Sequence, residues 1–250
     1  MCGIAGIWSL AGLGDPGTVK RSLADMAATI AHRGPDGQGV WTDGQVGLAH
    51  ARLAVIDVSD AGAQPMADTD GTVHLSYNGE IYNFRELRAE LTKLGHRFRT
   101  ASDTEVIIEG YKRWGTDVLA RLRGMFALAL WDSRARKLLL ARDRLGQKPL
   151  YYREGDGVLL FASEIKAILA WPGIERIPDM AAIGQFLTFQ YVPTPLTAFD
   201  GVRMLPPATA LIIDVEGTSE MTRYWSLPHP ETARKRPLAD LEEELRQRFD

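Results

Sequence analysis

Short runs of branched and aromatic residues recur along the chain and predict β-strands. The runs are IAGIW, QVGLAHARLAVID, GTVHLSYN, MFALALWD, KLLLARD, PLYYREGDGVLLFAS and ATALIIDV. Turn residues separate most of them, which favours antiparallel meanders over parallel strands joined by helices.

Three segments between these runs have the apolar spacing of amphipathic helices. Residues 19–33 place on one face Val19, Leu23, Met26 and Ile30. Residues 83–95 place on one face Phe84, Leu87, Leu91 and Leu94, with Gly95 as the stop. Residues 102–115 place on one face Val106, Ile107, Gly110, Tyr111 and Trp114. Two sheets with these helices on their outer surfaces would bury every apolar face, so we predict a layered α+β fold.

Two of the helices have start signals of the capping-box type. Asn83 precedes the second helix with Glu86 at the third helical position, and Ser102 with Glu105 repeats the pair in the third. We therefore expect each polar residue to cap its helix and each glutamate to bond back to the cap.

The pattern changes after Tyr224 and Trp225. Residues 1–225 predict one domain, 226–236 form a polar, proline-bearing linker, and 237–250 begin a new helical period. A lone terminal helix has nothing to pack on, so we expect the chain to be cut from a longer protein.

Composition excludes several classes of partner. The chain has 250 residues with 45% hydrophobic and 24% charged residues and a net charge of −3, so the basic surface typical of nucleic-acid or anionic-membrane binding is missing. A single cysteine makes no internal disulfide, and neither a membrane-spanning run nor a signal region is evident. We expect a cytoplasmic protein that acts on a small molecule, with no nucleic acid and no membrane as partner.

Neither the glycine-rich segment near the N-terminus nor the histidines indicate a cofactor or metal site. GLGDPG places Gly12, Gly14 and Gly17 after a strand and before a helix, with Asp36 further on, as in a dinucleotide fingerprint. Pro16 and the meanders that follow favour a plain glycine turn. The five histidines lack ligand spacing, and we expect no metal in this chain.

Cys2, the only cysteine, directly follows the initiator methionine. A free cysteine is most often a small buried hydrophobic residue. If Met1 is removed, however, one residue holds both a thiol and an α-amine, whose pKa of about 7.7 to 8.0 leaves part of it neutral and able to accept the thiol proton. Cys2 is therefore a candidate nucleophile that carries its own base.

Acyl transfer to such a nucleophile needs donors for an oxyanion and groups that hold the substrate. Asn78 offers a side-chain amide and Gly79 a backbone N–H at the end of a strand, although Asn-Gly is also the commonest tight-turn dipeptide. For an amino-acid substrate, Arg52 could bind the carboxylate, and Glu80 and Asp103 the ammonium group. Alternatively, Asp103 is a first-turn acid of a helix and Arg52 a surface charge.

Ten segments in chain order resemble the class II glutamine amidotransferase domain of the asparagine synthetase family. They are MCGIAGIW, HRGPDG, RLAVID, QPM, YNGEIYN, SDTEV, GMFALALWD, RDRLGQKPLYYR, FASEIKAIL and YVPTPLTAFDGVRMLPP. The resemblance runs from residue 1 to about 225 and implies a four-layer αββα N-terminal-nucleophile hydrolase sandwich of two mainly antiparallel sheets.

The resemblance also implies residue roles. Cys2 would attack the side-chain amide of L-glutamine, and Asn78 and Gly79 would form the oxyanion hole. The substrate-binding set would be Arg52, Leu53, Val55, Ile56, Asn78, Gly79, Glu80 and Asp103. The HRGPDG loop, with Arg33 and Asp36, would shape or cover the site.

In this family a second domain uses ATP, Mg²⁺ and a SGGxDS loop to amidate an activated carboxylate with the ammonia. That motif is absent from residues 1–250, so we expect the C-terminal synthetase domain of the same polypeptide as partner. The acceptor, aspartate against a sugar or a peptide, stays open, as does assembly into a homodimer. A different class of function is a non-catalytic interface module, which the intact Cys2, Asn78, Gly79, Arg52 and Asp103 disfavour.

Overall fold

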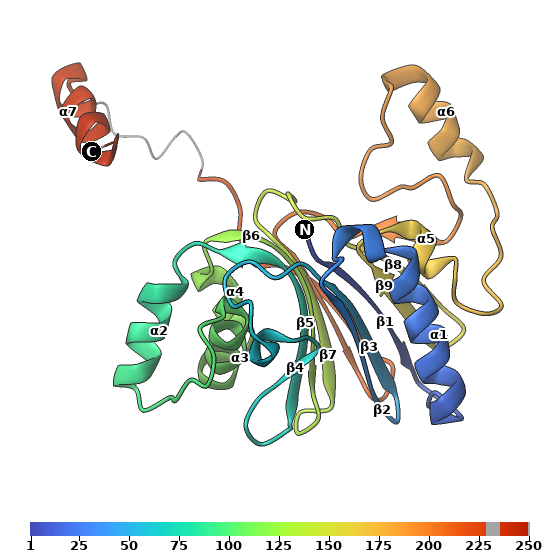
Figure 1. Cartoon of the computed structure of the whole chain (residues 1–250). Helices are drawn as coiled ribbons and strands as arrows, with labels where there is room; N and C mark the ends of the chain where they lie inside the picture. The colour runs from blue at the N-terminus through green and yellow to red at the C-terminus, as the bar shows by residue number, and fades with distance from the viewer. Residues whose placement is uncertain (229–235, 250) are drawn as a thin grey trace.

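The computed structural model describes residues 1–228 and 236–249, and within them two antiparallel sheets of six strands each pack face to face (Figure 1). The first sheet has the order β10 (Val202–Met204), β8 (Tyr151–Gly155), β9 (Val158–Ala162), β1 (Gly3–Ser9), β3 (Val46–Arg52), β2 (Gly37–Asp43). The second has the order β12 (Ser219–Arg223), β11 (Thr209–Asp214), β7 (Lys137–Arg142), β6 (Gly124–Asp132), β5 (Val73–Ile81), β4 (Met66–Ala67).

The two sheets share a core because their strands alternate side chains between two buried faces. On β6, Ala127, Ala129 and Trp131 pack between the sheets, while Phe126 and Leu128 point to the opposite side, toward helices. Both faces of the strand are therefore buried, which explains the nearly continuous apolar run of its sequence.

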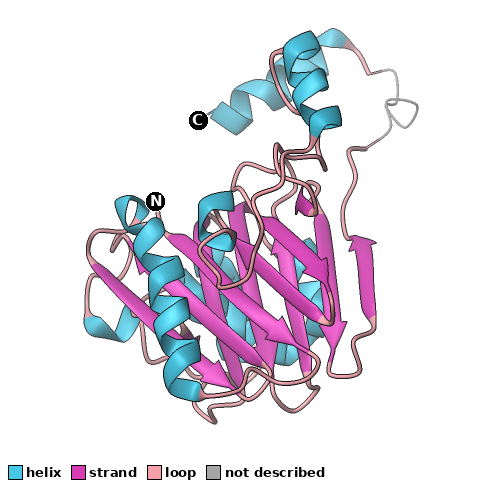
Figure 2. Cartoon of the chain, turned by 90° about the vertical axis from the view of Figure 1, so that its right-hand side faces the viewer, coloured by secondary structure: helices cyan, strands magenta, loops and turns pink. Residues whose placement is uncertain are grey.

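Helices cover the outer face of each sheet (Figures 1 and 2). α1 (Pro16–Thr29) and α5 (Ile165–Ile168) pack on the first sheet, and α2 (Phe84–Lys93), α3 (Asp103–Trp114) and α4 (Val118–Arg121) lie on the second. Short 3₁₀ turns occupy Ala31–Arg33, Asp60–Gly62 and Gly115–Asp117. The predicted αββα sandwich is confirmed.

The predicted helix starts are only partly right. Ser102 accepts the N–H of Thr104 and caps α3, but Glu105 bonds Arg99 N and Thr100 N instead of returning to its cap. Asn83 makes no cap bond. Its amide bridges the start of α2 to the chain after α4, donating to Arg121 O and accepting from Arg123 N.

The apolar faces of the predicted helices are buried, or partly buried at Phe84, Tyr111 and Trp114, with one exposed exception. Leu94 remains 48% exposed, because it lies after the last turn of α2, where Gly95 at φ 94° turns the chain away.

The glycine-rich segment after β1 is a turn. Gly12 and Gly14 have φ of 86° and 79°, and Asp15 then caps α1 by accepting the N–H of Thr18. Both neighbours of β1, β3 and β9, are antiparallel to it, so the parallel unit of a dinucleotide-binding fold does not form.

Several elements were not predicted. β2, β4, β10 and β12 are short or carry polar residues. α6 (Met180–Phe189) is apolar except for Gln185 and Thr188, which leaves its helical period weakly marked. α6 projects from the sandwich and leaves Met180, Phe186 and Leu187 more than half exposed (Figure 1).

The predicted C-terminal helix is present as α7 (Leu238–Phe249), and it buries none of its residues. Most of the expected linker, residues 229–235, lies outside the described residues. The division of the chain at 225 stays a prediction.

Candidate active site

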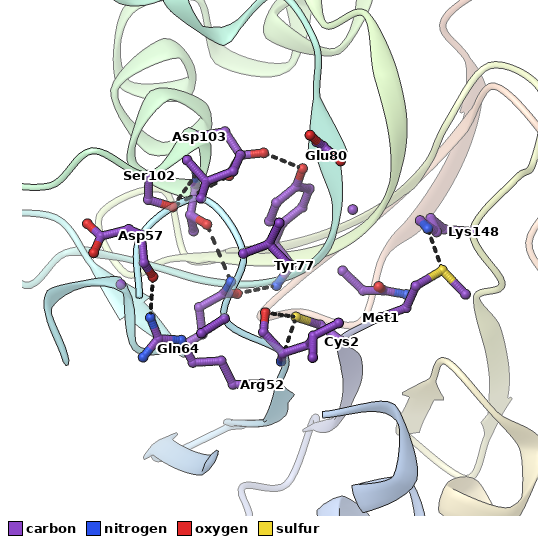
Figure 3. A pocket seen from close by; sticks show the side chains of 18 of the residues that line it. Met1, Cys2, Arg52, Asp57, Gln64, Tyr77, Glu80, Ser102, Asp103 and Lys148 are labelled. Carbon is purple, nitrogen blue, oxygen red and sulfur yellow. Dashed lines mark hydrogen bonds between the residues drawn. The ribbon is translucent and has the colours of Figure 1, made fainter. Parts of the chain in front are cut away.

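One cavity of about 120 Å³ brings together the two residues that precede β1 and residues from β3, β5, α3 and the loop after β3 (Figure 3). Among its lining residues are the predicted Cys2, Arg52, Leu53, Val55, Ile56, Asn78, Gly79, Glu80 and Asp103. Segments separated by more than a hundred positions in the sequence therefore meet around the single thiol.

Cys2 is held at the entrance to β1, a strand paired on both sides by β3 and β9. The Leu53 N–H donates to its sulfur at 3.3 Å, the thiol lies 3.5 Å from Leu53 O, and Arg33 Nε donates to its carbonyl at 3.0 Å. Burial raises the pKa of the thiol, while the Leu53 N–H and the Arg52 cation lower it. The thiol is mostly protonated at neutral pH and needs a base.

Met1 occupies part of the same cavity and is 60% exposed. Its thioether sulfur accepts a bond of 2.7 Å from Lys148 Nζ. In this form the nitrogen of Cys2 is an amide, which does not accept a proton near neutral pH.

Asn78 and Gly79 lie inside β5, opposite Ala127 and Phe126 of β6, so the tight-turn reading of Asn-Gly is wrong. Ser76 Oγ bonds Ala49 O in the facing sheet, and two residues later Asn78 points to the same side, toward β1. Its amide nitrogen Nδ2 is buried and has no hydrogen-bond partner within the described residues. Asn78 thus presents a free donor to the cavity.

The backbone N–H of Gly79 faces the open edge of β5. Tyr77 N and Ile81 N, two residues to either side, donate across that edge to Gln64 Oε1 and Asp103 Oδ2. By the two-residue period of a strand, the Gly79 N–H points the same way, and no described side chain accepts from it. A Cβ at this position would lie 2.2 Å from Met125 O, which explains the glycine.

Arg52 ends β3 and shapes the loop that follows. Its Nη2 donates to Asp57 O at 2.6 Å and to Ser59 O at 2.8 Å, so the loop curls around the guanidinium. The predicted strand through residue 57 therefore stops at Arg52, and Leu53, Val55 and Ile56 line the cavity from an irregular segment.

Asp103 connects β5 to α3. Its Oδ2 accepts the Tyr77 hydroxyl at 2.8 Å and Ile81 N at 3.0 Å, and its residue is 4% exposed. Burial and, more weakly, the nearby Glu80 carboxylate raise its pKa above the ordinary value. Two acidic side chains therefore share one end of the cavity, which favours a cationic ligand between them.

The two named residues of the HRGPDG loop, Arg33 and Asp36, are not among the lining residues of the cavity, but both bond segments that form it. Arg33 bonds Cys2 O and pairs with Glu164 at 2.9 Å, and Asp36 Oδ2 accepts Ala54 N at 2.8 Å. These contacts fix the two chain segments that meet at the thiol.

The sequence indicated no role for several polar residues of the lining, among them Gln64, Tyr77 and Lys148. Gln64 and Tyr77 tie β5 to its surroundings, as described above. Both QPM and RDRLGQKPLYYR stood out as motifs, but their residue types alone did not indicate which side chain reaches the cavity.

Within residues 1–228 and 236–249, no cluster of three or more His, Cys, Asp or Glu side chains is placed to hold a metal ion. None of the helices in these ranges combines the length and the apolar content needed to cross a bilayer.

A family model described as the glutamine amidotransferase domain matches residues 1–225. The chain belongs to this family. Asparagine synthetase [glutamine-hydrolyzing] 3 of Bacillus subtilis (strain 168) is 41% identical over 211 residues, which cover 83% of this chain and 34% of that protein. This amidotransferase domain is also similar to Amidase chry2 of Gibberella zeae, at 37% identity over 240 residues, which cover 94% of this chain and 35% of that protein.

Among solved structures, the glutamine phosphoribosylpyrophosphate amidotransferase of B. subtilis, complexed with ADP and GMP, superposes with a TM-score of 0.64 at 23% identity. The match covers 90% of this chain and 49% of that one, and it supports the four-layer fold of the amidotransferase domain. The chain spans about a third of the length of the asparagine synthetase and amidase relatives named above.

Proposed function

We propose that this amidotransferase domain hydrolyses glutamine to glutamate and ammonia through a thioester on Cys2. The observation that carries the proposal is the pairing of the single thiol with two unoccupied donors, Asn78 Nδ2 and the Gly79 N–H, around one cavity. A nucleophile and an oxyanion site are the parts that acyl transfer requires.

The chemistry needs Met1 to be removed first. The α-amine of Cys2 then takes the thiol proton while sulfur attacks the side-chain amide carbon, and the oxyanion is held by Asn78 and Gly79. The amine returns the proton to the leaving nitrogen, and ammonia departs as the C–N bond breaks. Water, activated by the same amine, hydrolyses the thioester to glutamate and restores the thiol.

The two ends of the cavity suit the amino-acid part of glutamine. Arg52 would bind the α-carboxylate through the N–H groups that its loop carbonyls leave free, and Glu80 and Asp103 would bind the α-ammonium. The backbone at Leu53, Val55 and Ile56 would line the side-chain path.

For the whole protein, we propose that ammonia passes to an ATP- and Mg²⁺-dependent synthetase domain of the same polypeptide, in the cytoplasm, with aspartate as acceptor. The similarity to an asparagine synthetase supports this acceptor. The similarity to a protein named an amidase supports, as a second candidate, a different amide acceptor served by the same glutaminase chemistry. Assembly into a homodimer stays a proposal, to be measured by light scattering.

Intact-mass analysis of preparations with and without methionine aminopeptidase treatment tests the mechanism. Each preparation is exposed to an electrophilic glutamine analogue and assayed for glutaminase turnover. We expect label on Cys2 in the processed form alone, with turnover proportional to the processed fraction. Equal labelling and equal turnover with Met1 retained would show that another group is the base.

A second test replaces the nucleophile. Cys2→Ala should abolish glutamine hydrolysis and leave the thermal unfolding temperature nearly unchanged, because the thiol makes only long bonds to Leu53. Turnover near the parent level in this variant would contradict the assignment of Cys2.

A further inference from the structure

The RDRLGQKPLYYR motif forms a rigid loop, and none of its residues has a role in the glutaminase mechanism described above. Arg142, at the end of β7, is buried and donates to three carbonyls, those of Gly146, Lys148 and Leu205, at 2.6 to 2.7 Å. A buried guanidinium with every bond directed at main-chain oxygens fixes the course of the loop around it.

The neighbouring Asp143 holds the same loop from inside. Its fully buried carboxylate accepts four backbone N–H groups, those of Phe126, Leu145, Gln147 and Lys148, at 2.9 to 3.2 Å. Gly146, at φ 68°, makes the turn that this arrangement needs. The side chain that the loop presents to the cavity is Lys148.

Lys148 is 3% exposed, yet the described residues give its ammonium no carboxylate within ion-pair distance. Its only bond there is to the thioether of Met1, a weak acceptor. Buried lysines are normally paired with an anion. Removal of Met1 would take away even this partner and leave an ammonium beside the new N-terminus.

Figure 3 shows Met1 between Cys2 and Lys148, on the side of the thiol away from Arg52. The charged and titratable groups that act on the Lys148 ammonium are Arg33, Asp143, Cys2 and Glu80. Burial and Arg33 lower its pKa, against the opposing effect of Asp143, Cys2 and Glu80. Two cationic side chains, Lys148 and Arg33, therefore flank the start of β1.

We propose that Lys148 is a positioning residue that acts on the Cys2 α-amine: its ammonium disfavours protonation of that amine and so keeps the general base free. The proposal rests on the glutaminase mechanism described above. A nearby like charge disfavours the charged form of a group, and a charge at the edge of a cavity shifts an amine by about one pH unit. The loop built on Arg142 and Asp143 would then hold this charge in place.

The experiment uses Met1-processed protein and measures kcat/KM for glutamine hydrolysis between about pH 5 and 9. Lys148→Met should move the acidic limb of the pH profile of kcat/KM about one pH unit upward. At a pH below that limb kcat/KM should then be about tenfold lower than in the parent, and above pH 8 it should change little. Lys148→Arg, which keeps the charge, should follow the parent. Lys137→Met, the same change at an exposed lysine on β7, is the matched control.

Thermal unfolding of each variant identifies loss of fold, and Lys148→Gln provides a second neutral side chain if the methionine variant does not fold. An unmoved acidic limb in a folded neutral variant would overturn the proposal. So would a Lys148→Arg profile that follows the methionine variant, since the charge would then not be the active property. Absence of turnover in the processed parent would instead reject the glutaminase mechanism itself.

Discussion

Asn78→Leu should separate catalysis from stability, because the amide of Asn78 is buried without a partner for Nδ2. Leucine has nearly the same shape but no donor. Loss of one oxyanion donor lowers kcat by about 10²- to 10³-fold, or about 3 to 4 kcal/mol. A buried polar group without a partner costs about 1 kcal/mol or more, so the same change should raise the unfolding temperature by about 2 to 4 °C in a domain of this size.

The assay pairs glutaminase kinetics with thermal unfolding. Asn83→Leu, the same substitution at the chain's other asparagine, is the control: its amide bonds Arg121 O and Arg123 N, so stability should fall by about 1 to 2 kcal/mol and kcat should hold. The reasoning would be refuted if Asn78→Leu kept kcat within tenfold of the parent, or if it unfolded at a clearly lower temperature than the parent.

Three further changes have directions set by the structure. Asp103→Asn should raise KM for glutamine at least about tenfold with little change in unfolding temperature, because the remaining oxygen can still accept the bonds from Tyr77 and Ile81. Tyr77→Phe, in contrast, should lower stability by about 2 kcal/mol. A loss of stability without a KM effect in Asp103→Asn would favour a purely structural aspartate. Glu164 is 24% exposed, and hydrogen bonds from its cationic neighbours lower its pKa to about 2. It should therefore contribute about 2 kcal/mol of folding stability that is present above pH 4.5 and lost as pH falls toward 2. The stability of Glu164→Gln should fall less steeply with acid than that of the parent, and identical acid dependence would contradict the pairing. Gly79→Ala should lower stability by about 3 kcal/mol, because its Cβ would lie 2.2 Å from a main-chain oxygen of β6. Gly37→Ala, with open space around it, should change stability by less than about 1 kcal/mol. Similar melting curves for both variants would refute the steric argument.

The layers of the fold could be predicted because each layer has its own periodicity. The β6 run is apolar on both faces, since one face meets the other sheet and the other face meets helices. α6 was not predicted, because Gln185 and Thr188 are its only polar side chains and mark a polar face too narrow to indicate a helix. Ser102 caps α3 as predicted, but the Asn83 cap and the return bond from Glu105 are absent, because both side chains bond main-chain groups outside their own helices.

In the cavity, too, the sequence predicted some of the functional residues and missed others. Cys2 and the Asn-Gly pair could be selected by their chemistry, but the sequence alone placed Asn-Gly at a strand end when it lies inside β5. Lys148 was not selected, because a lysine in sequence carries no sign of burial. Its position depends on Arg142 and Asp143, which also bond Leu205 O and Phe126 N, groups that the fold brings to the loop from distant parts of the chain.

The pairing of β1 determines when, during synthesis and folding, the site around the Cys2 thiol can form. Cys2 is synthesised before both partner strands of β1, which comprise residues 46–52 and residues 158–162. Strand pairing over such separations is a late and slow event in folding. The reactive thiol is therefore fixed in place only after both partner strands have been made, and a copy that lacked them would lack the shaped cavity needed to release ammonia.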